Sequence, residues 1–184
     1  MSPADKAVVS IGPVSKWTEN QLGQYRDLTE AVYPPAENAD WPGRKLDWAG
    51  AEMGVRVVDD SGWLVSYVGV LTREGLLDDK PVVIGGIGGV KTHPDARGMG
   101  YAAQGMRGAT EWFQHQPQVD FGLLVCDSSL LGYYSNLGWV EFVGRLLTTQ
   151  GGTTVEFTFN SVMTQPIHSH APETGTIDLL GAPW

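Results

Sequence analysis

Short apolar runs bounded by glycine, proline and acidic residues are the most regular feature of the sequence, and such runs predict strands. The runs 55–58 and 63–71 are joined by turn-forming residues at 59–62. A longer run at 82–92 is interrupted by glycines, and residues 74–80 predict the hairpin connection before it. The predicted strands are 7–11, 55–58, 63–71, 82–92, 121–126, 139–143 and 155–163.

Helices are predicted from end signals and from apolar residues at helical spacing. Thr18 and Gln21 form a capping box, which predicts a helix from there to about Val32, before two prolines. A helix at 129–137 ends at Gly138. A third helix follows from the spacing of Ala102, Met106, Ala109 and Phe113.

The order of these elements is β-α-β-β-β-α-β-α-β-β, which predicts a mixed α/β fold. Antiparallel meanders flank one strand–loop–helix–strand unit. The 184 residues give room for one domain. We therefore expect one domain over 1–184, with 164–184 as a C-terminal tail that could line a binding site.

The charge balance limits the possible partners. Lys and Arg number 12 against 21 Asp and Glu, so the net charge is −9 at pH 7. A surface that binds nucleic acid needs clustered cations, and docking on anionic lipid needs them as well. We therefore expect no nucleic-acid and no membrane partner. Apolar residues make up 42% of the chain, as in folded globular proteins.

Cysteine content and targeting signals bear on the compartment. The single cysteine, Cys126, excludes an intramolecular disulfide and is compatible with a reducing cytoplasm. We find no signal peptide and no apolar stretch near the roughly 18 residues of a membrane span, so we expect a cytoplasmic protein. His168 and His170 have no third ligand at helical spacing, which predicts a loop pair and no metal site.

Glycine is over-represented, and its distribution points to a functional region. Of 24 glycines, eight lie between Gly85 and Gly108. A strand, a glycine-bearing loop and a helix follow one another there, and a free helix N-terminus binds anions such as phosphate. Gly98 and Gly100 would let the backbone approach a pyrophosphate, and Arg97 adds positive charge. A tight turn without a ligand is the simpler alternative.

Two common phosphate loops fit this region poorly. The P-loop requires Gly-Lys-Ser/Thr, which the sequence lacks. The dinucleotide fingerprint permits Ala103 as its third small residue and Asp120 as its acid. The antiparallel meander before the loop, however, is not how a dinucleotide-binding fold begins.

The loop resembles that of a known enzyme family. Arg97-x-x-Gly100-x-Ala102 resembles the Arg/Gln-x-x-Gly-x-Gly/Ala signature of the GNAT superfamily of N-acetyltransferases. The segment from Leu130 to Trp139 is similar to that family's helix, which ends in Tyr-x-x-x-Gly-aromatic. The resemblance covers about 8–163 and is strongest over 84–146. Within the superfamily, the chain is most similar to aminoglycoside 2'-N-acetyltransferases.

The resemblance implies a fold, a cosubstrate and a set of site residues. The fold is a mostly antiparallel central sheet with two splayed parallel strands, flanked by helices, and the cosubstrate is acetyl-CoA. The main-chain N–H near Val90 would polarise the thioester, and Tyr134 would protonate the leaving thiolate. The pantetheine would pair with Val90, Lys91 and Thr92. The pyrophosphate would contact Arg97, Gly98, Met99, Gly100, Tyr101 and Ala102.

The proton acceptor for the attacking amine is less defined. Asp127 is best placed, because it follows the second splayed strand. We interpret Cys126 as a small buried residue, because no histidine signature accompanies it. The other candidates are Glu37, Asp40, Glu141, Asp178 and the chain-terminal carboxylate of Trp184.

One departure from the aminoglycoside 2'-N-acetyltransferases that the chain resembles concerns the acceptor. The resemblance implies a glutamate on the central strand, at the position that Gly88 occupies in this chain. The run 85–89 could leave room for a different acceptor, admit another segment, or form a bulge. The loop 33–48, with Tyr33, Trp41 and Trp48, could form an acceptor wall. We expect a small amine, with an amino sugar as one candidate.

Two alternatives to an enzyme remain open. The absence of an obvious base is compatible with a non-catalytic acyl-CoA-binding or regulatory module on the same fold. A nucleotide site would also use a glycine loop. Some members of the superfamily pair through C-terminal strands, so 155–163 is a candidate for a homodimer contact.

Overall fold

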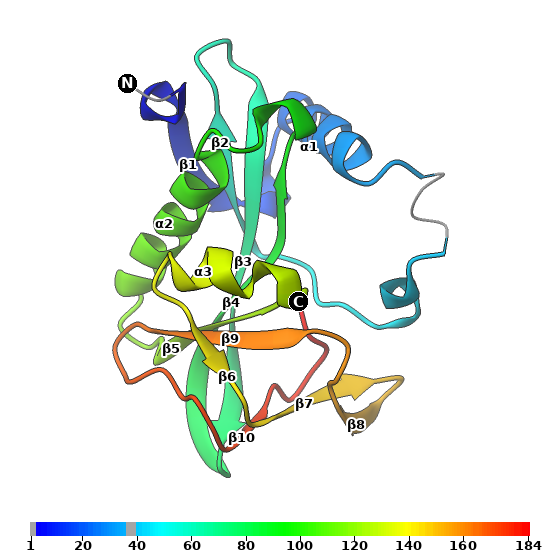
Figure 1. The fold of residues 1–184 in the computed structure, drawn as a ribbon, viewed down its shortest axis with the longest axis vertical. Coiled ribbons are helices and arrows are strands. Elements are labelled where there is room, and N and C mark those ends of the chain that lie inside the picture. The colour runs from blue at the N-terminus through cyan, green and yellow to red at the C-terminus, as the bar shows by residue number, and fades with distance from the viewer. Residues whose placement is uncertain (1–2, 36–39) are drawn as a thin grey trace.

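The computed structural model describes residues 3–35 and 40–184, and within them ten strands form one curled sheet (Figure 1). The path through the sheet is β6-β9-β5-β4-β3-β10-β7-β8, while β2 joins β3 to β1. The strands are β1 (Val8–Pro13), β2 (Met53–Val58), β3 (Leu64–Leu77), β4 (Lys80–Thr92), β5 (Phe121–Cys126), β6 (Val140–Phe142), β7 (Arg145–Gln150), β8 (Thr153–Glu156), β9 (Ser161–Pro166) and β10 (Thr176–Asp178). The predicted mixed α/β class is confirmed.

The three predicted helices are present as α1 (Glu19–Val32), α2 (Tyr101–Gln114) and α3 (Leu131–Ser135). Thr18 Oγ1 accepts a hydrogen bond from the Gln21 N–H, and Gln21 Oε1 accepts one from the Thr18 N–H. The capping box therefore forms as predicted. Gly138 has a φ of +86°, which allows the chain to turn after α3. None of the helices in the described ranges is long and apolar enough to cross a bilayer.

The β3–β4 hairpin is longer than the sequence predicts. Residues 74–77, assigned above to a connection, continue β3, and the turn is made by Asp78 and Asp79. Both have positive φ, as a two-residue hairpin turn requires. The added strand length is stabilised by β10, which pairs with Leu76 and Leu77.

α1 and α2 lie on opposite faces of β4 (Figure 1). A Cβ at Gly85 would contact Phe113 of α2 at 2.7 Å, while one at Gly88 would contact Trp184 on the other face. Lys91 and Gly88 pair with Tyr67 and Gly69, which share a face of β3. α1 and Trp184 therefore lie on one face, and α2 lies on the other.

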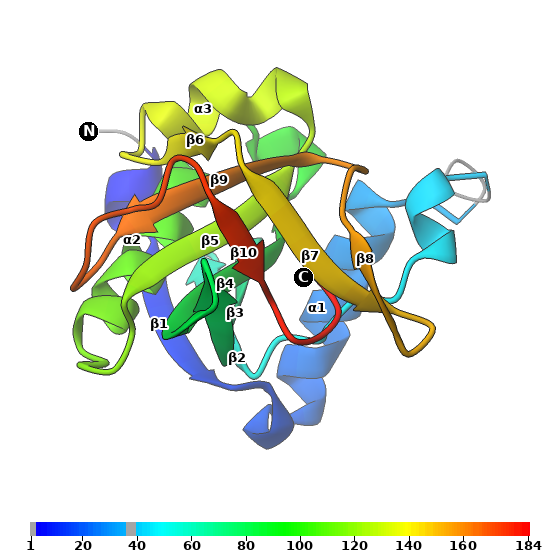
Figure 2. The ribbon, with the colours of Figure 1, turned by 90° about the horizontal axis from the view of Figure 1, so that it is seen from below.

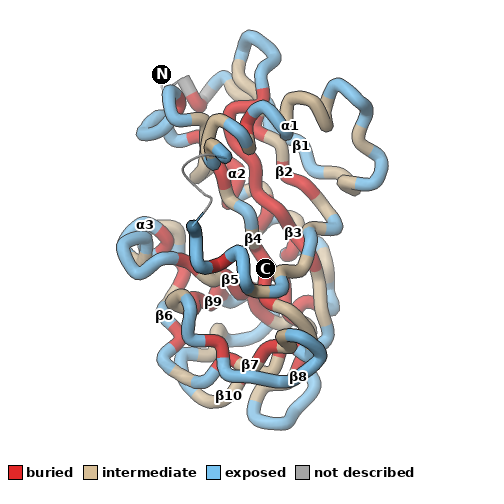
Figure 3. Tube along the Cα trace, turned by 90° about the vertical axis from the view of Figure 1, so that its right-hand side faces the viewer, coloured by how far each residue is buried: buried red, intermediate tan, exposed pale blue. Residues whose placement is uncertain are grey.

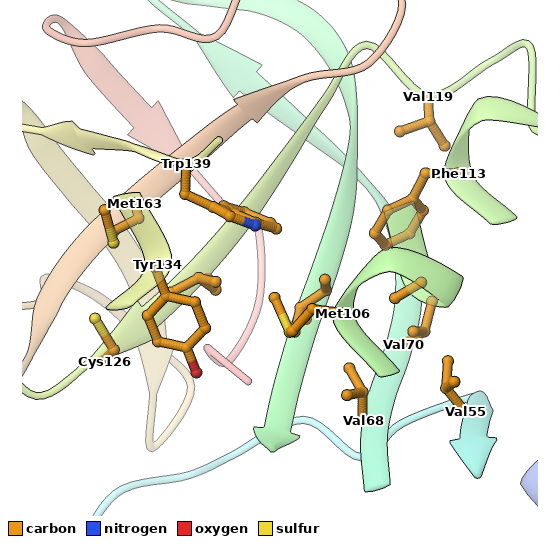
Figure 4. Packing of buried hydrophobic residues seen from close by; sticks show 13 residues of the cluster. Val55, Val68, Val70, Met106, Phe113, Val119, Cys126, Tyr134, Trp139 and Met163 are labelled. Atoms are coloured by element: carbon orange, nitrogen blue, oxygen red, sulfur yellow. The ribbon is translucent and has the colours of Figure 1, made fainter. Parts of the chain in front are cut away.

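Large apolar side chains fill both layers. On the α2 face, Met106 and Phe113 pack with Ile87, Leu124 and Trp139 (Figure 4). Full burial of such a side chain stabilises the fold by roughly 1.5–3 kcal/mol. The buried segments run through the middle strands and the exposed ones lie outside them (Figure 3).

The C-terminal third differs from its prediction. The strand predicted at 155–163 is divided between the end of β8 and the start of β9, because Gly151 and Gly152 turn the chain back into a β7–β8 hairpin. The tail is not outside the sheet either. β10 lies between β3 and β7 (Figure 2) and buries Ile177 completely.

Candidate functional site

The parallel strands β4 and β5 separate at one end, and this opening is the candidate site. They pair from Ile84↔Phe121 to Ile87↔Leu124, the last pair that the described residues form. Beyond it, β4 continues to Thr92 and β5 to Cys126. The sheet therefore has a V-shaped gap whose walls are two strand ends.

A bulge on β4 lies at the start of the gap. Gly88 pairs with Gly69 and Lys91 pairs with Tyr67, so β4 has one residue more than β3 between these two pairs. Gly89, within this bulge, has a φ of +60°. The Lys91 carbonyl accepts from Ser66 Oγ of β3 at 2.9 Å. Successive backbone groups of a strand point in opposite directions, so those of Val90 face β5.

The loop between β4 and α2 has the properties of an anion site. Gly98 and Gly100 have φ of +75° and +91°, which favour glycine. Gly100 is the N-cap of α2, and no described side chain caps this helix end. Its first N–H groups are therefore available to an anion. A Cβ at Gly98 would meet no described atom within 4 Å.

The other predicted loop residues differ in exposure. The Arg97 Nε donates to the Thr92 carbonyl at 3.4 Å, which holds Arg97 against the end of β4. Met99 is 40% exposed, whereas Tyr101 is buried against Ala4. Ala102 lies in the first turn of α2. The nine predicted cosubstrate-binding residues thus follow one another in chain order, three at the end of β4 and six from the loop into the first turn of α2.

Tyr134 lies on α3, beside β5. It is 5% exposed and packs with Cys126, Met106 and Trp139, while its hydroxyl points away from Trp139 (Figure 4). Burial is the largest effect that raises the pKa of its phenol above the ordinary value. Cys126 and the neighbouring tyrosines raise this pKa further, by smaller amounts. The side chain therefore remains a neutral O–H donor at physiological pH.

Cys126 and Asp127 end β5 in contrasting environments. Burial, with the charges of Asp127 and Glu141, raises the pKa of the Cys126 thiol to about 11, so the thiol stays protonated. Asp127 is exposed and caps the short 3-10 turn that leads into α3. Hydrogen bonds from the Ser129 side chain and N–H hold the pKa of Asp127 below its usual value.

The family model of the GNAT acetyltransferase domain matches residues 13–142, which contain the gap, the loop and α3. The chain belongs to the GNAT acetyltransferases. Among curated proteins, none matches the chain at the sequence level.

Solved structures agree on the fold of this acetyltransferase. The E. coli GNAT family N-acetyltransferase YhbS, in complex with CoA, is 13% identical with a TM-score of 0.62, over 97% of this chain and 95% of that one. E. coli ElaA is 19% identical with a TM-score of 0.59, over 86% and 99%. A Brucella melitensis GNAT acetyltransferase, in complex with acetyl-CoA, is 14% identical with a TM-score of 0.55, over 92% and 94%.

In this acetyltransferase, Tyr33 follows the last residue of α1 and lies near Lys91, whose Nζ is 6.0 Å from the centroid of the Tyr33 ring. Burial raises the pKa of the Tyr33 phenol, Tyr25 adds to that shift, and the charge of Arg97 opposes it. Tyr33 therefore lies beside a residue of β4 that is predicted to bind the cosubstrate. The motifs do not include Tyr33.

The side chain of Lys91 has a role that the motif does not indicate. It is 7% exposed, and its Nζ donates to Tyr25 Oη at 2.8 Å and to Thr29 Oγ1 at 2.9 Å. The same Nζ lies 4.1 Å from the centroid of the Tyr25 ring, within cation–π range. Lys91 therefore joins β4 to α1 on the face away from α2.

Trp184 explains two of the four glycines in the run 85–89. A Cβ at Gly86 would overlap the Trp184 ring, and one at Gly88 would lie 2.8 Å from the Trp184 backbone carbon. The indole Nε1 donates to the Leu123 carbonyl of β5 at 3.1 Å. The run therefore admits another segment at Gly86 and Gly88, and it forms a bulge at Gly89. Two of the three alternatives left open by the sequence therefore occur, at different positions.

Among the other candidate carboxylates, that of Trp184 lies at the start of the gap, because a Cβ at Gly88 would lie 2.8 Å from the Trp184 carboxyl carbon. Glu37 lies outside the described residues. Asp178 pairs with Leu76, at the end of β3 opposite to the β4–β5 gap, and accepts from the Leu180 N–H. Glu141 is exposed on β6. Within the described ranges, no group of three histidine, cysteine or carboxylate side chains is arranged as metal ligands.

Proposed function

We propose that this protein is an acetyl-CoA-dependent N-acetyltransferase that acetylates a small-molecule amine by direct attack on the thioester. One observation carries the proposal: the β4–β5 gap ends at the uncapped N-terminus of α2, behind a loop with two left-handed glycines. The gap suits an extended pantetheine arm, and the loop suits a pyrophosphate. YhbS in complex with CoA and the Brucella protein in complex with acetyl-CoA, which share the fold, support it.

The walls of the gap have distinct roles in this mechanism. Val90, Lys91 and Thr92 hold the pantetheine as an added strand, and the loop from Arg97 to Ala102 holds the pyrophosphate. The Val90 N–H donates to the thioester carbonyl oxygen, and its bond to that oxygen strengthens as negative charge develops. The nitrogen lone pair forms a C–N bond, and collapse of the tetrahedral carbon breaks the C–S bond.

Tyr134 and Asp127 handle the two protons. Tyr134 donates its phenolic proton to the departing thiolate, which leaves CoA as a thiol. Because burial keeps this phenol neutral, its proton is available throughout the physiological pH range. Asp127, ionised at neutral pH, accepts the proton that the amine loses, through water. Its lowered pKa makes it a weak base.

The acceptor approaches from the face that carries α1 and Trp184, because α2 and α3 occupy the other face. The net charge of −9 favours an amine that is cationic in solution. An amino sugar, as in the aminoglycoside-modifying relatives that the sequence resembles, is one acceptor of this class. By that resemblance, the position of Gly88 would carry a glutamate. Gly88 lies under Trp184 and has no space for a side chain.

Thermal shift and thiol-release assays test the proposal together. We expect acetyl-CoA and CoA to raise Tm, NAD and ATP to leave it unchanged, and an amine library to release free CoA thiol. Stabilisation by NAD or ATP without CoA would replace the proposal with a nucleotide site. Binding of CoA without transfer to any amine would leave an acyl-CoA-binding module.

A further inference from the structure

Four aromatic side chains form a cluster that the acetyltransferase motifs do not include. Trp41 and Trp48 stack with centroids 6.1 Å apart and planes 17° apart. Phe159 meets Trp41 and Trp48 edge-on, and Phe157 meets Trp48 and Phe159 in the same way. We call this set the aromatic platform.

The aromatic platform extends from the core to the surface. Phe157 is 7% exposed, whereas Trp41 is 45% and Phe159 36% exposed. Two large rings therefore present apolar surface to water beside two that are partly or fully covered. Exposed rings that gather in one place mark a binding surface more often than scattered ones do.

The platform is continuous with the acceptor face of the gap. Trp48 and Phe157 belong to the same apolar cluster as Trp184, which lies over Gly86 of β4. The Ala49 N–H also donates to the Pro183 carbonyl at 2.6 Å. The segment 40–50 accordingly crosses in front of the C-terminal end of the chain (Figure 3). The platform therefore belongs to the apolar layer that contains Trp184, on the face away from α2.

The loop that carries Trp41 and Trp48 is held by two hydrogen bonds to the β7–β8 hairpin and by one within the loop. The Asp47 N–H donates to Gln150 Oε1, and the Gly151 N–H donates to Asp47 Oδ2, both at 2.7 Å. Trp48 Nε1 donates to the Gly43 carbonyl at 2.8 Å. The rings are therefore positioned before any ligand binds, which reduces the entropy lost on binding.

We propose that the aromatic platform binds the ring of an arylalkylamine, so that the acetylated amine is carried on a short chain next to a flat aromatic group. This inference rests on the proposed function, because it assigns the acceptor of the same site. Aromatic rings attract one another in offset and edge-on arrangements, and the platform offers both. The ammonium group suits the negative net charge of the protein.

The polar groups of the platform argue against a polyhydroxylated acceptor. The indole N–H of Trp48 already donates to the Gly43 carbonyl, and Phe157 and Phe159 have no polar side-chain atom, so the four rings offer a ligand only the indole N–H of Trp41. Sugar hydroxyls placed there would lose hydrogen bonds to water without replacing them. An arylalkylamine ring loses no such bonds.

Steady-state kinetics with matched variants test this assignment. We expect 2-phenylethylamine and tryptamine to exceed glucosamine and n-butylamine in kcat/KM. Trp41→Ala should raise the KM for 2-phenylethylamine about tenfold and leave the KM for acetyl-CoA unchanged. Phe159→Leu, which keeps apolar volume but removes the ring, should raise it several-fold. Trp63→Ala is the control, because Trp63 is 58% exposed and lies on the β2–β3 turn.

A binding measurement separates this inference from the proposed function. Saturation-transfer NMR reports whether 2-phenylethylamine contacts the protein, with or without acetyl transfer. Loss of that contact in Trp41→Ala but not in Trp63→Ala supports the platform even if no amine is acetylated, and the enzymatic proposal alone would then fail. Acetylation of glucosamine in preference to 2-phenylethylamine, or an unchanged KM in Trp41→Ala, would overturn the platform and leave the enzymatic proposal standing.

Discussion

Tyr134 is the residue on which the proposed proton transfer depends. General acid catalysis of this kind contributes roughly 10²–10⁴-fold. We therefore expect Tyr134→Phe to lower kcat at least about hundredfold while the Kd of acetyl-CoA changes little, because the ring remains and only the hydroxyl is lost. Stopped-flow thiol release and calorimetry measure the two quantities.

Tyr133 provides the matched control for this substitution. It neighbours Tyr134, with ring centroids 5.0 Å apart, but it is 36% exposed. Tyr133→Phe should retain nearly full kcat. Equal losses in the two variants would show that neither hydroxyl is the acid.

Cys126 gives a prediction that depends on pH. Burial raises the pKa of its thiol to about 11, so the folded protein holds this proton more tightly than the unfolded chain does. Since the thiolate is the reactive form, alkylation at pH 8 should be about hundredfold slower in the native protein than in denaturant. The rate in the native protein should rise with pH until about 11, the pKa of the buried thiol, whereas the rate in denaturant should level off near the ordinary thiol pKa. Mass spectrometry of iodoacetamide adducts measures them, and equal rates at pH 8 would contradict the buried position.

At the scale of elements, β4 and the C-terminal segment depend on each other through Gly86. A methyl group at this position would overlap the Trp184 ring. Overpacking of this kind costs about 1–3 kcal/mol. We expect Gly86→Ala to lower the free energy of unfolding by that amount in urea denaturation.

Two further variants isolate the cause. Gly12 lies in β1, and a Cβ there would meet no described atom within 4 Å, so Gly12→Ala should change stability little. The double variant Gly86→Ala/Trp184→Ala should lose less free energy of unfolding than the sum of the two single variants, because the added methyl group has space once the indole ring is removed. Additive losses in the double variant would place the strain elsewhere.

α1 is held on the sheet by an apolar cluster and by Lys91. Leu28, the one buried residue of this helix within the described ranges, packs with Leu64 and Tyr67 of β3. Tyr25 and Thr29 accept hydrogen bonds from the Lys91 Nζ of β4. Burial also raises the pKa of Tyr67, which therefore remains neutral. The helix that leads to Tyr33 is thus positioned by apolar packing together with polar and cation–π contacts.

At the scale of the whole molecule, net charge should have opposite effects on the two proposed substrates. A charge of −9 repels the polyanionic acetyl-CoA and attracts an ammonium acceptor, and salt screens both effects. Raising NaCl from about 20 to 200 mM should lower the KM for acetyl-CoA and raise the KM for a cationic amine, each about twofold. An uncharged acceptor, measured at a pH above its pKa, is the control. Parallel shifts of both KM values would show that the overall field is not the cause.

The features that depend on neighbouring residues could be predicted from the sequence alone. The capping box at Thr18 starts α1, the spacing of Met106 and Phe113 defines α2, and Gly100 marks the entry to α2. Each is set by contacts within a few residues along the chain, so local pattern is sufficient. The resemblance to the GNAT superfamily, carried by such local motifs, is confirmed, and the narrower resemblance to aminoglycoside 2'-N-acetyltransferases stays a prediction.

The features that depend on partners distant along the chain required the folded structure. β10 has three residues and no strong pattern, and it forms because β3 and β7 pair with both of its edges. Gly86 is explained by Trp184, which is nearly 100 residues away along the chain. The aromatic platform likewise joins Trp41 to Phe159. Strand pairing and ring packing are determined by spatial neighbours that the linear pattern does not specify.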